Sequence, residues 1–144
     1  MTARPATPSV NAMINALHTL IYAEDPDAAR AFFRDVLQFP NVDAGGGWLI
    51  FRTGPSETGL HPSSWEYEGT SGSTDQRFDV SLMCDDLAAT MEELRGRGAT
   101  FEGEVGEEPW GSTIELVVPG AGTITLYQPK YASPAIDEDP QPMG

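Results

Sequence analysis

The stretch HTLIYAEDPDAARAFFRD, residues 18–35, has a counterpart further along the chain, DVSLMCDDLAATMEELRG, residues 79–96. Aligning the two places Asp25 on Asp86, and each stretch runs from a short apolar segment through this aspartate into apolar residues at helical spacing. Aspartate is a preferred residue at a helix N-terminus, so each copy predicts a strand followed by a helix. Similarity between two parts of one chain predicts a duplicated structural unit.

The elements that follow each copy also correspond. For the first copy we predict a strand at 16–23, a helix that begins at Asp25-Pro26, and short strands at 39–44, 48–52 and 57–61. For the second we predict a strand at 78–84, a helix that ends at Gly98, and strands at 100–105, 112–118 and 123–128. The predicted fold class is therefore α+β, with two tandem βαβββ modules.

Proline-rich and polar segments flank the predicted fold. We predict a flexible N-terminal segment at 1–13 that is not a secretory signal, a single domain at about 14–131, and a flexible acidic tail at 132–144. Within the domain we predict module one at about 14–62, a connection at 63–76 and module two at about 77–131.

The composition is that of a globular protein with a strong acidic excess. The chain has 144 residues, of which 40% are hydrophobic, and a formal net charge of -14. Such a protein repels phosphate backbones and anionic lipids, which argues against nucleic acids and membranes as partners. The lone Cys84 excludes an intramolecular disulfide and favours a cytoplasmic location. Because two aspartates follow Cys84, we expect a raised thiol pKa and a buried, inert cysteine.

Three stretches, residues 18–39, 78–101 and 117–129, together resemble one protein family. It is the vicinal oxygen chelate superfamily, also called the glyoxalase/bleomycin resistance protein/dioxygenase group. The resemblance implies curled mixed sheets that form a cup, and short chains that pair as homodimers to complete two cups. In many members a divalent metal such as Zn, Ni, Fe or Mn sits in the cup and acts as a Lewis acid. Other members, such as bleomycin-binding proteins, use the cup without a metal.

The family's metal ligands lie on the first and last strand of each module, which implies a slot at four positions of this chain. His18 matches the first slot, and it is also the candidate catalytic residue. The second slot falls on Gly59, with His61 two residues later, and the third falls on Asp79. The fourth, a glutamate in many relatives, is Thr125, which is a poor metal ligand. The candidate metal set is therefore His18, His61 and Asp79; the alternatives are a cavity-lining histidine, a loop-edge histidine and an exposed acid at a strand start.

Glu115 carries a carboxylate on the strand that precedes Thr125. It alternates with Thr113 and Val117, and the sequence leaves open whether it points into the cup or towards solvent.

Aromatic residues supply the second set of candidates. Tyr22, Trp48, Trp110 and Tyr127 fall on predicted strands around the cup, where they suit a mostly apolar ligand. Arg52 follows the Trp48 strand and could pair with an anionic ligand. The alternatives are that the aromatic residues fill the core and that Arg52 is a solvated rim residue.

Two functions remain open at this point. The first is a small-molecule-binding protein of the glyoxalase/bleomycin resistance type, with a partly degenerate metal site and an apolar or aromatic ligand in the cup. The second is a metal-dependent lyase, isomerase or dioxygenase that uses His18. Thr125 favours the first function, and His18 keeps the second open.

Overall fold

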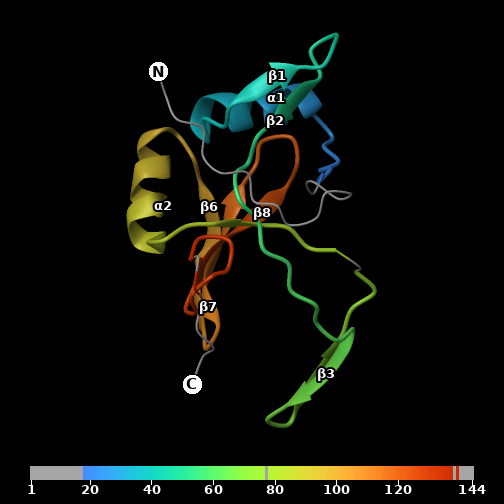
Figure 1. Cartoon of the computed structure of the whole chain (residues 1–144), viewed down its shortest axis with the longest axis vertical. Coiled ribbons are helices and arrows are strands. Elements are labelled where there is room, and N and C mark those ends of the chain that lie inside the picture. The colour runs from blue at the N-terminus through green and yellow to red at the C-terminus, as the bar shows by residue number, and fades with distance from the viewer. Residues whose placement is uncertain (1–17, 77, 138, 140–144) are drawn as a thin grey trace.

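The computed structural model describes residues 18–76, 78–137 and 139 of the chain. The predicted N-terminal segment at 1–13 and the end of the predicted tail, 140–144, lie outside the described residues. The fold is mixed α+β, as predicted (Figure 1). In chain order the elements are α1 (Pro26–Ala31), the π-helical turn η1 (Phe32–Val36), β1 (Asn41–Asp43), β2 (Leu49–Phe51), β3 (Ser64–Tyr67), β4 (Thr70–Ser73), β5 (Ser81–Met83), α2 (Leu87–Gly96), β6 (Phe101–Glu108), β7 (Gly111–Val117) and β8 (Thr123–Pro129).

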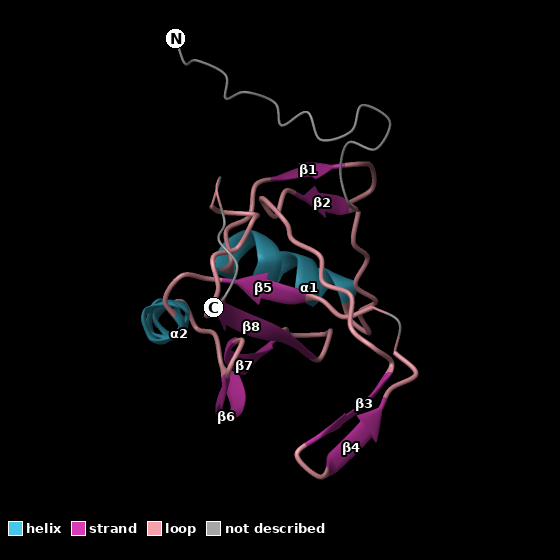
Figure 2. Cartoon of the chain, turned by 60° about the horizontal axis from the view of Figure 1, so that its bottom comes forward, coloured by secondary structure: helices cyan, strands magenta, loops and turns pink. Residues whose placement is uncertain are grey.

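The second module forms a complete βαβββ unit. Its four-stranded sheet has the order β5-β8-β7-β6, in which β5 runs parallel to β8 and the other neighbours are antiparallel (Figure 2). Helix α2 connects β5 to β6 and begins at Asp86, whose side chain accepts a 3.0 Å hydrogen bond from the N–H of Ala89. The predicted strand–aspartate–helix pattern is therefore present here.

The first module begins with a capped helix. The Asp25 carboxylate accepts a 3.1 Å hydrogen bond from the N–H of Ala28, and Pro26 occupies the first helical position. The chain then forms a β1–β2 hairpin, in which the Asp43 carboxylate accepts hydrogen bonds from the N–H groups of Gly45 (2.8 Å) and Gly47 (3.1 Å). Local side-chain to backbone bonds therefore explain both the helix start and the turn.

Two predicted strands of the first module differ from the structure. Residues 18–23 and 57–61 belong to no strand; the first segment is apolar at positions 20–23, whereas Leu60 is the one apolar residue of the second. A strand needs a neighbouring edge to bond with, and among the described residues neither segment has one within this chain.

A hairpin of β3 and β4 lies within the predicted connection instead, and it extends away from the main sheet (Figure 2). Its two turn residues, Glu68 and Gly69, have φ angles of 50° and 80°. Positive φ at both positions is typical of the tight turn that joins hairpin strands. The glycine at the second position was the available sequence signal for this hairpin.

The core lies between the helices and one face of the four-stranded sheet. We call this the helix face; its buried side chains are those of Ile114, Leu116, Ile124 and Leu126. Phe32 and Phe33 of η1 pack against it with Leu87, Met91 and Leu94 of α2. The two helical segments are linked where Arg97 donates a 2.7 Å hydrogen bond to the carbonyl oxygen of Val36. Both helical segments therefore cover the same face of the sheet, and within the described residues no helix covers the other face.

Candidate functional site

The sheet face opposite the helices carries polar and aromatic side chains. We call it the open face; it is formed by Ser81, Met83, Thr113, Glu115, Val117, Thr123, Thr125 and Tyr127. Side chains alternate between the two faces of a strand, so these positions follow from the burial of Ile114, Leu116, Ile124 and Leu126 on the other side. Glu115 stands directly opposite Thr125, and Thr113 stands opposite Tyr127. These four residues are half-buried, which distinguishes them from an ordinary solvated surface.

Glu115 lies along the open face towards β8. One carboxylate oxygen accepts a 3.0 Å hydrogen bond from the hydroxyl of Thr123, and the other accepts a 2.8 Å bond from the hydroxyl of Thr125. Glu115 therefore lies on the sheet face opposite the helices, and that this face lines a cup stays a prediction. A carboxylate from the neighbouring strand lies within hydrogen-bond distance of the position where many relatives carry a glutamate.

Three aromatic residues gather at one end of the open face; we call them the aromatic trio. The ring centroids of Trp110 and Tyr127 are 5.6 Å apart, and those of Tyr127 and Tyr131 are 6.3 Å apart. The Tyr127 hydroxyl donates a 3.1 Å hydrogen bond to the backbone carbonyl of Trp110. Two of the predicted ligand-binding residues, Trp110 and Tyr127, are therefore in contact. Sequence reasoning missed Tyr131, for which the signal was an aromatic residue just beyond the last predicted strand.

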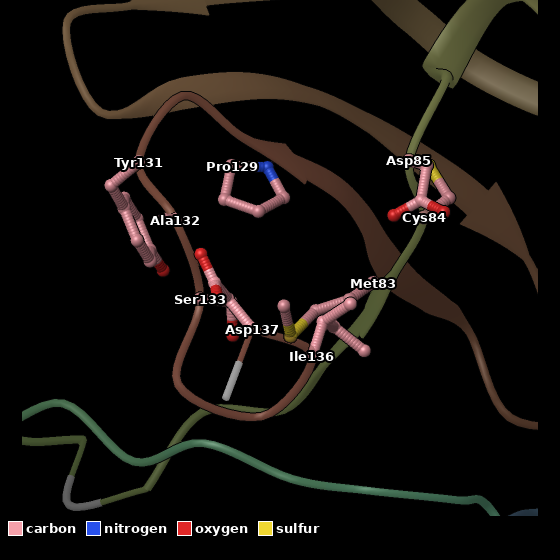
Figure 3. Close-up of a pocket in the computed structure, with 9 residues that line it drawn as sticks. All are labelled: Met83, Cys84, Asp85, Pro129, Tyr131, Ala132, Ser133, Ile136 and Asp137. Carbon is pink, nitrogen blue, oxygen red and sulfur yellow. The ribbon is translucent and has the colours of Figure 1, made fainter. Parts of the chain in front are cut away.

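A cavity of about 330 Å³ adjoins this end of the sheet (Figure 3). The ends of β5 and β8 line it together with the C-terminal segment that follows β8. Its lining residues are Met83, Cys84, Asp85, Pro129, Tyr131, Ala132, Ser133, Ile136 and Asp137. Small-molecule sites are typically concave and about 300 Å³ or larger. The cavity therefore has the size of a small binding pocket.

Glu57 connects the first module to the C-terminal segment. Its carboxylate accepts hydrogen bonds from the hydroxyls of Tyr131 and Ser133, and Ser133 is buried. Burial, followed by the hydrogen bond to Glu57, raises the pKa of Tyr131 well above its usual range. Tyr131 therefore stays a neutral hydrogen-bond donor, and its hydroxyl helps to hold one wall of the cavity in place.

Cys84 is half-buried at the end of β5. Burial, together with the charges of Asp85 and Asp86, raises the pKa of its thiol, against a smaller opposite effect from a hydrogen bond with Thr90. A raised thiol pKa lowers the fraction of reactive thiolate at a given pH.

We therefore expect iodoacetamide to alkylate Cys84 at pH 8 about tenfold more slowly in the folded protein than in urea. The rate, measured by mass spectrometry, is compared with that of N-acetylcysteine in the same two solvents. Equal rates in the folded and unfolded protein would show that the environment of Cys84 does not suppress its reactivity.

The predicted metal ligands are exposed and lie on three separate segments. His18 and His61 lie outside any strand, and Asp79 precedes β5. Among the residues that the structure describes, no three His, Cys, Asp or Glu side chains are grouped so that they could hold a metal ion. The hydroxyl of Thr125 donates to Glu115. The donor set of one chain does not fit the family's four-ligand site, and the set of His18, His61 and Asp79 stays a prediction.

The other predicted ligand-binding residues belong to the first module. Tyr22 is 88% exposed, and the guanidinium carbon of Arg30 lies 4.9 Å from the ring centre of the exposed Trp48. Arg52 is exposed just beyond β2, and its backbone N–H donates a 2.8 Å hydrogen bond to Pro40. Tyr22 and Trp48 do not join the aromatic trio in this structure, and the roles of all three residues stay predictions.

Comparison with known proteins places the chain in a family. Residues 15–119 match the model of the Glyoxalase/Bleomycin resistance protein/Dioxygenase superfamily. The chain therefore belongs to this superfamily, and the resemblance seen in its sequence is confirmed. The comparison with curated proteins found no match.

Several solved structures are similar to this chain. A glyoxalase/bleomycin resistance protein/dioxygenase from Nocardioides is 17% identical, with a TM-score of 0.49 over 92% of this chain and 94% of that one. The antibiotic-binding protein TnmS3 from Streptomyces sp. CB03234 is 21% identical, with a TM-score of 0.47 over 76% and 91%. A lactoylglutathione lyase from Agrobacterium tumefaciens is 20% identical, with a TM-score of 0.46 over 76% and 90%. None of the helices in the described residues has the length and apolarity needed to cross a membrane.

Proposed function

We propose that this protein binds a small apolar or aromatic molecule on the open face, and that its metal site is degenerate. The observation that carries the proposal is the arrangement at one end of this face. The aromatic trio lies there, and one of its members, Tyr131, also lines the cavity of about 330 Å³. The polar groups of Glu115 and the threonines lie outside that cavity, further along the same strands. A mostly apolar recess with a few placed polar groups is typical of small-molecule sites.

We further propose that two copies of the chain form a homodimer that completes the cup. Large apolar side chains of the first module and of the start of the second are exposed in the single chain: Leu20 is 62%, Tyr22 88%, Leu60 92% and Phe78 87% exposed. Exposed apolar groups in such number are typical of an interaction surface. The segments at 18–23 and 57–61 have no strand partner among the residues that the structure describes, and a second copy would provide one. The proposed location is the cytoplasm, where Cys84 stays reduced.

The neutral dye N-phenyl-1-naphthylamine provides a test of binding, because its fluorescence rises in apolar surroundings. We expect the dye to bind the wild-type protein and to bind about tenfold more weakly to Tyr127→Ala, which removes the central ring of the aromatic trio. Trp65→Ala on the β3–β4 hairpin serves as the control and should leave the affinity unchanged.

Two outcomes would argue against the proposal. Dye binding that is insensitive to Tyr127→Ala would place the ligand elsewhere. Stoichiometric metal in protein purified without an affinity tag, lost in His18→Ala, would support the metal-dependent lyase, isomerase or dioxygenase instead. Sedimentation equilibrium tests the dimer, and a monomer at micromolar concentration would contradict it.

A further inference from the structure

We propose that Glu115 is the anchor for a positively charged, hydrogen-bond-donating group of the ligand, such as an ammonium, whose aromatic body lies beside Tyr127. This inference rests on the proposed function and names the chemical class of the ligand: an aromatic or apolar amine.

The Glu115 carboxylate is held in one orientation but can still accept further hydrogen bonds. Each of its oxygens accepts one threonine hydroxyl, at 3.0 and 2.8 Å. A carboxylate offers about four acceptor positions, so roughly two remain. The two hydroxyls hold the carboxylate in one direction on a half-buried face, which reduces the entropy that a ligand must remove on binding.

No cationic side chain among the residues described neutralises the negative charge of Glu115. Within the described part of the chain, the ion pairs join other residues, and none includes Glu115. Its cross-strand neighbour on β6 is Glu102, a second carboxylate, so the chain places a like charge directly opposite. A cationic group supplied by the ligand would relieve this repulsion, whereas an anionic group would increase it.

An aromatic surface begins on β8 close to Thr125, the residue opposite Glu115. Tyr127 follows Thr125 by two residues and therefore projects from the same side of β8, about 7 Å further along. It packs against Trp110 and Tyr131, so a broad apolar surface begins there. Aromatic rings also attract cations held near their faces. A carboxylate opposite Thr125, with aromatic rings beginning two residues further along β8, complements a molecule with an amine at one end and a ring at the other.

Two probes of nearly equal shape test the inference: 2-phenylethylammonium and 2-phenylethanol. They differ by an ammonium in place of a hydroxyl, so the difference in affinity measures recognition of the charge. We expect the ammonium to bind the wild-type protein about tenfold more tightly than the alcohol, as followed by NMR shifts of the amides of residues 113–117 and 123–127. In Glu115→Gln, which keeps the size of the side chain, we expect the preference to disappear.

A matched control separates a direct contact from the general effect of net charge. Glu92→Gln on the exposed side of α2 removes the same charge on the helix side of the sheet, opposite the site, and we expect it to keep the preference for the ammonium. A preference that survives in Glu115→Gln, or is lost equally in Glu92→Gln, would overturn the inference.

The failure of this inference differs from the failure of the proposed function. Equal binding of both probes on the open face would overturn the role of Glu115 and leave the proposed function standing. If neither probe nor the neutral dye perturbs the open face, the proposed function fails and the inference fails with it.

Discussion

Replacing Leu116 with alanine is expected to lower the free energy of unfolding by about 3–5 kcal/mol. Leu116 is 0% exposed and lies at the centre of the helix face. It stands opposite Ile124 on β8 and Phe101 on β6, and it belongs to the same core cluster as Phe33 and Met91. Its removal leaves a cavity between the helices and the sheet. The backbones of these two layers are fixed by their own hydrogen bonds, so the neighbouring side chains cannot move in to fill it.

Urea unfolding followed by circular dichroism measures this change. Leu116→Met keeps nearly the same volume and serves as the control, with an expected cost below about 1.5 kcal/mol. If Leu116→Ala and Leu116→Met have similar midpoints, the side chain does not occupy a rigid core position.

Replacing Gly120 with alanine is expected to cost about 2–4 kcal/mol, because two effects add at this position. Gly120 lies in the turn between β7 and β8 with a φ angle of 81°, which an alanine adopts only with strain. A Cβ atom there would also meet the backbone carbonyl oxygen of Asp25 and would lie 2.7 Å from the Asp25 Cβ atom. The N–H of Asp25 donates a 3.0 Å hydrogen bond to the Gly120 carbonyl, so the added atom would separate the start of α1 from this turn.

Gly122 is a matched control in the same turn. Its φ angle is 74°, but a Cβ atom there meets nothing within 4 Å. Gly122→Ala should therefore show only the backbone strain, about 1 kcal/mol. Equal destabilisation by the two substitutions in thermal unfolding would show that the contact between Gly120 and Asp25 contributes nothing.

The sequence predicted the capped helices because the interactions that start them are local. Asp25 and Asp86 bond with the N–H groups of Ala28 and Ala89, each three residues away. Because N-terminal capping involves residues within one helical turn, it can be predicted from a short stretch of sequence. The two aspartates that aligned the internal repeat are also the residues that begin α1 and α2.

The first module was predicted less well because its expected strands depend on partner strands that cannot be identified from their own sequence. The apolar residues at 20–23 have the composition of a strand, and Leu60 lies in the second expected strand at 57–61, yet the single chain provides no edge for either segment among the residues described. The hairpin of β3 and β4 formed from serine-rich and glycine-rich residues that sequence reasoning assigned to a connection. Its strands pair with each other through a two-residue turn, so they need no distant partner.

In the candidate site, too, local features were predicted from the sequence and contacts between distant residues were not. The sequence contained Glu115, Thr125, Trp110 and Tyr127. It placed Glu115, Thr125 and Tyr127 on the right strands, whereas Trp110, expected on a strand, lies in the turn between β6 and β7. It did not decide that Glu115 stands opposite Thr125, because strand register depends on residues on both strands at once. Nor did it reveal that Glu57 bonds with Tyr131 and Ser133, more than 70 positions further along the chain.

By itself, then, the sequence determined the element order of the second module, the two helix starts and the family of the protein. Helix capping and hydrophobic periodicity depend on residues close together in the sequence, and duplication repeats a sequence pattern. All three can therefore be recognised from the sequence alone. Only the tertiary structure decided which face of the sheet the helices cover, and therefore which side chains remain on the open face. That choice placed Glu115 and the aromatic trio on the side away from the core, because burying Leu116 and its apolar neighbours against the helices turns the alternate residues outwards.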